Sequence, residues 1–277
     1  MLKQLLKYEF KATGRVYGGL YLAILAVAVL MGSFFRADSL PEELIAVMMM
    51  IYLALAVAIV VVTLLTTIQR FTRNLLGREG YLMHTLPVTS GQLILSKLIS
   101  SVTWILCGGP VVLLSFGLFG LLGTVNSAAV SELMKSLLNY WPEAEKLLGI
   151  VIENYGITLV LMAVEWLVSL NCSILCIYTA CMIGHWCKKY AAPAGIAAFV
   201  VLNVVQDRLL SLLPYKSGNA GLNLVFTPVN DGGLTYAVTG SRGTVWAVLA
   251  ALAADLVLCG IYFAATSWMM KNKLNLE

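Results

Sequence analysis

Charged residues are scarce in this sequence. Asp, Glu, Lys and Arg make up 12% of its 277 residues, about half the share typical of soluble domains, whereas 60% of the residues are hydrophobic. This balance excludes a soluble chain with a large core and is typical of a polytopic membrane protein. The net charge of +4 is small, and it gives no reason to expect a nucleic-acid partner.

The motifs of a phosphate-binding loop and of zinc proteases are also absent. No Gly-Lys dipeptide occurs, so the chain lacks a phosphate-binding loop of the form G-x-x-x-x-G-K-[ST]. Only two histidines are present, His84 and His185, and no H-E-x-x-H motif occurs. We therefore expect no catalytic residues in this chain, and no ATPase site of its own.

One group of residues has the spacing of metal ligands. Cys181, His185 and Cys187 follow one another at i, i+4 and i+6, which suits a soft metal. A closed zinc site needs a fourth ligand, and the sequence GHWCKKY is equally typical of a membrane boundary with an interfacial Trp186. We expect no metal site here.

Long apolar runs dominate what is present. A spanning helix needs about 20 mostly apolar residues to cross about 30 Å of hydrocarbon. Six runs meet or approach this length: Tyr17–Phe35, Leu44–Ile68, Leu93–Leu122, Ile157–Ile183, Tyr190–Val205 and Thr244–Met270. The sequence therefore predicts an all-α polytopic membrane protein with six transmembrane helices in a single membrane domain, residues 1–277.

The basic residues predict the orientation. With six spans both ends share one side, and that side carries 12 of the 18 basic residues: Lys3, Lys7, Lys11, Arg15, Arg70, Arg73, Arg78, Lys97, Lys188, Lys189, Lys271 and Lys273. The other side carries Arg36, Lys135, Lys146, Arg208, Lys216 and Arg242. Because short cytoplasmic segments are rich in Lys and Arg, both termini are predicted to be cytoplasmic.

Segments outside the spans differ in character. Residues 1–16 place Lys3, Lys7 and Lys11 at i, i+4 and i+8, with leucines largely on another face, which predicts an amphipathic helix on the inner leaflet, near anionic lipid headgroups. Val125–Tyr155 is expected to be a loop holding two short helices, the second restarting after Pro142. The end of the fifth run, Gln206–Arg208 onward, is expected to be re-entrant or interfacial, and Pro214–Gly243 irregular.

Two carboxylates fall inside predicted spans. Glu165 shares a helical stripe with Ser169, Cys172, Cys176 and Thr179, and Asp255 shares one with Cys259, Tyr262 and Thr266. Ionisable groups at such depth mark either a substrate pathway or a buried polar contact between helices. Both interpretations stay open for Glu165 and Asp255.

The connector between the second and third spans, residues 69–92, is unusually polar. Apolar residues alternate there with charge, in the order Arg73, Leu75, Leu76, Arg78, Glu79, Tyr81, Leu82 and Leu86. Pro87 ends this segment, and Thr89 with Gln92 matches a capping box that begins the third span. The pattern predicts a short surface helix, a corner and a membrane helix.

This connector resembles the coupling helix of ABC-2 type ATP-binding cassette permeases. That family has a pattern close to E-x-x-L-x-x-L-P-[VI]-[ST]-x-x-Q-[LI]-[LI]-x-x-K in the same loop. Here Leu86, Pro87, Val88, Thr89, Gln92, Leu93, Ile94 and Lys97 match that pattern in register. Glu79 and Leu82, with Gly80 and Tyr81 between them, match it with one additional residue between Leu82 and Leu86. The layout of six spans with both ends inside is also similar, but only the connector is specific.

The resemblance implies a bacterial cytoplasmic-membrane permease that docks on a separate ATP-binding subunit, which would bind ATP and Mg²⁺. A second permease chain, identical or paralogous, would complete the pathway. The expected contacts with the ATPase are Arg78, Glu79, Tyr81, Leu82, Leu86 and Pro87. The substrate would be a peptide antibiotic, a drug or a lipid. Two alternatives remain: a membrane anchor or sensor that transports nothing, and an ion-coupled transporter that uses Glu165 or Asp255.

Overall fold

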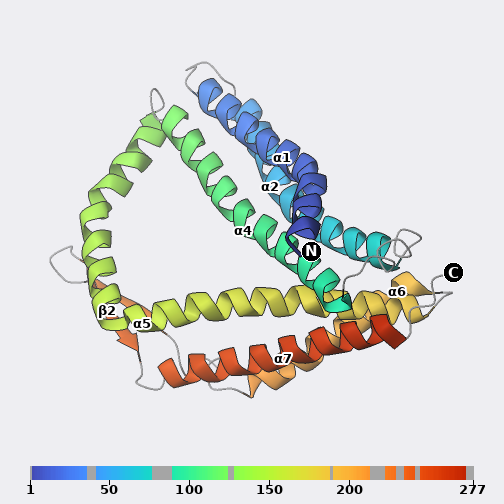
Figure 1. Cartoon of the computed structure of the whole chain (residues 1–277). Helices are drawn as coiled ribbons and strands as arrows, with labels where there is room; N and C mark the ends of the chain where they lie inside the picture. The colour runs from blue at the N-terminus through green and yellow to red at the C-terminus, as the bar shows by residue number, and fades with distance from the viewer. Residues whose placement is uncertain are drawn as a thin grey trace. The chain divides into compact units, whose positions relative to one another are not determined.

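The computed structural model describes residues 2–35, 42–76, 89–123, 128–187, 190–212, 222–228, 234–240 and 244–272. Its helices are α1 (Leu2–Phe35), α2 (Glu42–Phe71), the π-helix η1 (Thr72–Leu76), α4 (Ser90–Gly123), α5 (Ala128–Trp186), α6 (Ala191–Ser211) and α7 (Thr244–Asn272) (Figure 1). Two strands, β1 (Leu222–Pro228) and β2 (Leu234–Gly240), precede α7. The chain divides between Ala144 and Glu145 into two compact units.

Six of the described helices are long and apolar enough to cross a membrane. They are α1, α2, α4, α5, α6 and α7, and each contains one of the six runs predicted from the sequence, except that Tyr190 lies just ahead of α6. The chain is therefore a multi-pass membrane protein with a helical membrane domain, as predicted. Side chains of α2 such as Leu53 and Val60, each 65% exposed, present the apolar surface that lipid would cover.

In the first unit, α1 and α4 run parallel, and α2 runs antiparallel to both. Along α1, Glu9 meets Lys97 near the start of α4, and Gly32 approaches Leu122 near its end. Tyr52, early in α2, bonds Ser115, late in α4, with 2.8 Å between the hydroxyl oxygens. The alternating directions are those expected of three successive spans.

The helix α1 has no break at residue 16, where the sequence predicts a passage from an interfacial helix to the first span. Lys3, Lys7 and Lys11 are exposed, whereas Glu9 and Thr13 on another face are buried. The N-terminal segment continues the first span in one helix.

The prediction for Val125–Tyr155 is wrong in one respect: α5 continues through Pro142 in a single helix of 59 residues. Proline removes one backbone donor and crowds the carbonyl four residues earlier, which normally weakens a helix. Pro142 is exposed, so that carbonyl can be solvated, and the helix passes through.

The fifth run and the segment after it also differ from the prediction. The helix α6 extends to Ser211 and includes Gln206, which is buried, so residues 206–208 are not a separate re-entrant piece. Within the segment expected to be irregular, β1 and β2 form an antiparallel hairpin from the Leu222–Gly240 pair to the Pro228–Leu234 pair. Both strands are rich in β-branched and aromatic residues, and the intervening sequence VNDGG is a strong turn signal.

In the second unit, α6 runs antiparallel to the last part of α5, and α7 runs parallel to it. Gly184 of α5 lies against Gly195 of α6, while Cys172 contacts Gln206 farther along. Thr179 of α5 meets Thr266 of α7, and the Cys259 thiol lies near the Val168 carbonyl. Figure 1 shows α5 and α7 side by side.

Candidate functional site

The residues expected to dock on an ATPase lie outside the described part of the chain. Arg78, Glu79, Tyr81, Leu82, Leu86 and Pro87 all belong to residues 77–88. The structure does describe both ends of this connector. The π-helix η1, which contains the fully buried Leu75, leads into it, and α4 begins just after it.

The start of α4 has the predicted capping box. The backbone N–H of Gln92 donates to Thr89 Oγ1, and the backbone N–H of Thr89 donates to Gln92 Oε1, both at 3.4 Å. The Thr89 carbonyl also accepts from the N–H groups of Gln92 and Leu93, at 3.0 and 3.2 Å. These reciprocal bonds satisfy donors that a helix start leaves without partners, so α4 has a defined beginning at the end of the connector.

A single carboxylate joins the two flanks of the connector. Glu9 of α1 is 6% exposed; its Oε1 accepts from Lys97 Nζ of α4, and its Oε2 lies 3.5 Å from Arg70 Nη1 of α2. Arg70 precedes residues 77–88 of the connector by seven positions, and Lys97 follows them by nine. A displacement of Arg70 or Lys97 would therefore change the contacts of Glu9.

The two contacts of Glu9 differ in strength. The Lys97 side chain is 4% exposed, and breaking such a buried pair by removing one partner costs about 3–5 kcal/mol. The Arg70 side chain is 25% exposed, its separation from Glu9 is longer, and solvent screens it, so this pair contributes less than about 1 kcal/mol. The Lys97–Glu9 pair therefore holds α4 against α1, and the Arg70–Glu9 pair is the weaker contact, which breaks more easily.

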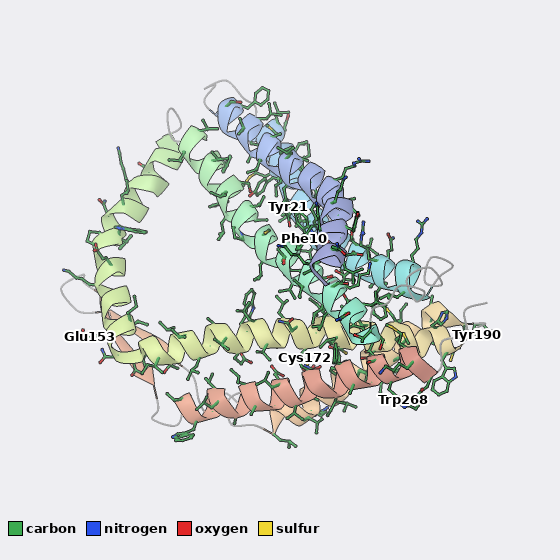
Figure 2. The ribbon with its side chains drawn as sticks, viewed as in Figure 1. Phe10, Tyr21, Glu153, Cys172, Tyr190 and Trp268 are labelled. Carbon is green, nitrogen blue, oxygen red and sulfur yellow. The ribbon has the colours of Figure 1, made fainter. Side chains whose placement is uncertain are left out.

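An aromatic layer lies directly beyond the charged cluster. The Tyr17 and Trp104 rings stack with centroids 4.6 Å apart, and Trp104 Nε1 donates to Thr13 Oγ1 at 2.8 Å. The Tyr21 hydroxyl donates a hydrogen bond to the Trp104 carbonyl at 2.8 Å, and the Phe10 ring packs against the Trp104 indole. Figure 2 shows Phe10 and Tyr21 between α1 and α4. Stacking and bonding at several successive turns make α1 and α4 a rigid pair.

Sequence reasoning missed the role of Glu9. Glu9 is the only acidic residue in the first 37 positions, where four basic residues surround it, and it lies off the lysine stripe. Lys97 was recognised as part of the connector pattern, but its partner was not. A lone carboxylate among lysines on an amphipathic helix, together with the single lysine inside the third run, was the available signal.

In the second unit, the two polar stripes predicted from the sequence face one another. Thr179 and Thr266 are buried and lie 3.0 Å apart between hydroxyl oxygens, and Thr266 also donates to the Tyr262 carbonyl at 2.7 Å. Cys172 and Cys176 on α5 are buried on the same side (Figure 2, Cys172). These contacts make the stripes an interface between helices.

The helix α6 adds two side-chain amides, those of Gln206 and Asn203, to the interface between α5 and α7. Gln206 Nε2 lies 3.7 Å from the Cys172 sulfur, and Gln206 Oε1 accepts from the Tyr262 hydroxyl at 3.4 Å. Asn203 Nδ2 lies 3.8 Å from the Cys176 sulfur. Asp255 is 2% exposed near the middle of α7, whereas Glu165 is half-buried. Asp255 thus belongs to the interior of the second unit, while Glu165 lies nearer its edge.

Within the described residues, no three His, Cys, Asp or Glu side chains are arranged to hold a metal ion. Cys181 and His185 are half-buried and Cys187 is exposed, so the three do not turn toward a common interior point. The chain matches no protein-family model, and no match was found among curated proteins or solved structures. Its function must therefore be argued from these residues.

Proposed function

We propose that this chain is the permease subunit of an ATP-driven exporter, energised by a separate ATP-binding subunit. The observation that carries the proposal is the position of Glu9, which bonds one residue before and one residue after residues 77–88. A partner that pushed residues 77–88 would displace the ends of α2 and α4, and Glu9 and the aromatic layer would carry α1 with them.

The proposal needs a partner because the chain has no phosphate-binding loop. Two ATPase subunits that close on ATP would press on the connectors of two permease chains. The helices α1, α2 and α4, which the contacts of Glu9 join, would then move as a rigid body, which is a common form of domain movement. The apolar interior with few charges suits an amphipathic substrate such as a peptide antibiotic, a drug or a lipid.

Co-purification tests this proposal. The tagged chain, as wild type and as Leu86→Asp, would be isolated in mild detergent from its native cells, and any ATP-binding subunit that co-purifies would be identified and quantified. The matched control is Leu138→Asp, the same change at a leucine that is 62% exposed in the early part of α5, on the predicted opposite side. We expect a stoichiometric complex for wild type and the control, and loss of at least tenfold in recovered ATPase for Leu86→Asp.

Recovery of equal ATPase with Leu86→Asp would overturn the docking assignment of the connector. Absence of any ATPase with a well-folded wild-type chain would overturn the permease proposal and favour the anchor or ion-coupled alternative. In the ion-coupled case, Asp255→Asn would abolish transport, because Asp255 is the more deeply buried of the two carboxylates.

A further inference from the structure

The outward face of α1 changes character along its length. Residues on this face recur every three or four positions and are exposed: Lys7, Lys11, Arg15, Gly19, Leu22, Ala26 and Val29. The first three carry positive charge, and the last three are apolar. Glu9, the one acidic residue in α1, lies on the buried face and is engaged by Lys97 and Arg70, and among the described residues no carboxylate pairs with these outward cations.

The depth of these residues follows from the helix length. The uncharged part of α1, Val16–Phe35, has 20 residues and spans about 30 Å at 1.5 Å per residue, which equals the hydrocarbon thickness. For a helix along the membrane normal, Arg15 lies at the hydrocarbon boundary and Lys11 about 6 Å beyond it, within the headgroup layer. Lys7 and Lys3 lie about 12 and 18 Å beyond the boundary, outside that layer.

Two glycines lie between the charges and the apolar residues of this face. Gly18 and Gly19 have no side chains, and a Cβ placed on either would meet no neighbouring atom within 4 Å. Leu22, one turn farther, is 69% exposed. Along this helix face there follow two cations, two glycines and an apolar surface.

We propose that this face binds an acidic glycerophospholipid. Lys11 and Arg15 hold its anionic headgroup, the glycerol backbone lies over Gly18 and Gly19, and an acyl chain runs along Leu22, Ala26 and Val29. Charge complementarity selects an acidic headgroup over a zwitterionic one. Because the cations continue directly into exposed apolar surface, a lipid matches the whole face, whereas an acidic protein would match only its first half. This site is independent of the proposed transport function.

Native mass spectrometry of the purified full-length chain tests the proposal. The ligands are phosphatidylglycerol and phosphatidylcholine with identical acyl chains, and inorganic phosphate in a third arm. The variants are Lys11→Gln with Arg15→Gln, the matched control Lys3→Gln with Lys7→Gln, and Gly19→Leu, which adds a side chain where the glycerol backbone would lie without changing charge. The melting temperature without added lipid shows that each variant is folded.

We expect wild type to prefer phosphatidylglycerol, and the Lys11/Arg15 variant to lose affinity for it roughly 30-fold, the effect of removing two cations near an anionic headgroup. The affinity of the Lys3/Lys7 control for phosphatidylglycerol should fall less than about threefold, and Gly19→Leu should weaken binding although all four cations are intact.

Equal binding of both lipids, or equal losses of affinity in the two charge variants, would show only a general electrostatic attraction to positive charge and overturn the site. Displacement of the lipid by phosphate alone would show an anion site and overturn the lipid assignment. Retention of phosphatidylglycerol by the Lys11/Arg15 variant would leave these cations to a protein partner and overturn it too.

Discussion

The Lys97 ammonium donates a hydrogen bond to the carboxylate of Glu9, which lies 88 positions earlier in the chain. Both side chains of this ion pair are buried between α1 and α4. Glu9 belongs to a segment that, by composition, should lie on the membrane surface, and Lys97 is the last residue of the connector pattern. Their contact joins the N-terminal helix to the segment on which a cytoplasmic partner would act. It also explains why α1 continues without a break: the buried carboxylate needs α4 beside it.

Removing either member of this pair should destabilise the chain, and unequally. Lys97→Met leaves Glu9 with Arg70, whereas Glu9→Gln leaves two cations beside each other without the carboxylate between them. We expect a loss of about 3 kcal/mol in unfolding free energy for Lys97→Met and a larger loss for Glu9→Gln. Arg70→Gln should cost less than about 1 kcal/mol, since that side chain is 25% exposed. Unfolding titrations in detergent measure these differences.

The double variant Glu9→Gln with Lys97→Met is the internal control. Because it removes both charges together, it should be more stable than Glu9→Gln alone. Additive losses, with the double variant less stable than either single one, would contradict an interaction between the two side chains.

Local chemistry in this chain was predictable, and distant pairing was not. The Thr89–Gln92 capping box and the apolar runs depend on residues within one or a few turns, so the sequence alone indicated them. Glu9 and Lys97 meet only because α1 and α4 run parallel at one particular register, and no local pattern contains that register. The same applies to Gln206, which faces Cys172 of α5.

The errors in the prediction also have physical reasons. Pro142 was interpreted as a helix break, but an exposed position tolerates the lost backbone bond. The hairpin β1–β2 was missed because Gly, Asn and Pro around it outweighed its short β-branched stretches. The docking residues of the connector lie outside the described part of the chain, so their assignment remains a prediction.

Gly184 should not tolerate a side chain. A Cβ there would lie 2.6 Å from the Ala191 carbonyl oxygen and 2.8 Å from two backbone atoms of Gly195, none of which is a flexible side-chain end. We expect Gly184→Ala to separate α5 from α6 and to cost about 1–3 kcal/mol. Gly260→Ala on α7 is the matched control, because a Cβ there meets nothing within 4 Å and the change should be neutral or slightly stabilising. Similar melting temperatures for the two variants would contradict the close approach of α5 and α6.

The Thr179–Thr266 contact should couple α5 to α7. Each hydroxyl also lies within hydrogen-bond distance of a carbonyl one turn earlier in its own helix, at 2.9 and 2.7 Å. Because each hydroxyl has a single proton, one of them donates across to the other threonine only in place of its own carbonyl, and each keeps a carbonyl partner when the other is removed. A double-mutant cycle with Thr179→Val and Thr266→Val should therefore give a coupling of only about 0.6 kcal/mol, the usual scale for polar contacts between membrane helices. A coupling indistinguishable from zero in detergent titrations would mean that the hydrogen bond between Thr179 and Thr266 does not stabilise the interface between α5 and α7.

Glu79→Ala should separate ATP hydrolysis from transport while leaving the fold intact. In the proposed permease, Glu79 is a charged contact with the ATPase, at the start of the connector pattern. Its loss should weaken partner binding about tenfold, equivalent to about 1.4 kcal/mol, without altering the melting temperature of the isolated chain. Glu132→Ala, at an exposed glutamate in the early part of α5, is the matched control. Titrating the ATP-binding subunit against each variant in nanodiscs, with ATPase rate and substrate efflux recorded together, measures both steps. If Glu79→Ala and Glu132→Ala bind the subunit equally well, Glu79 faces solvent, and the charged contact must lie elsewhere in residues 77–88.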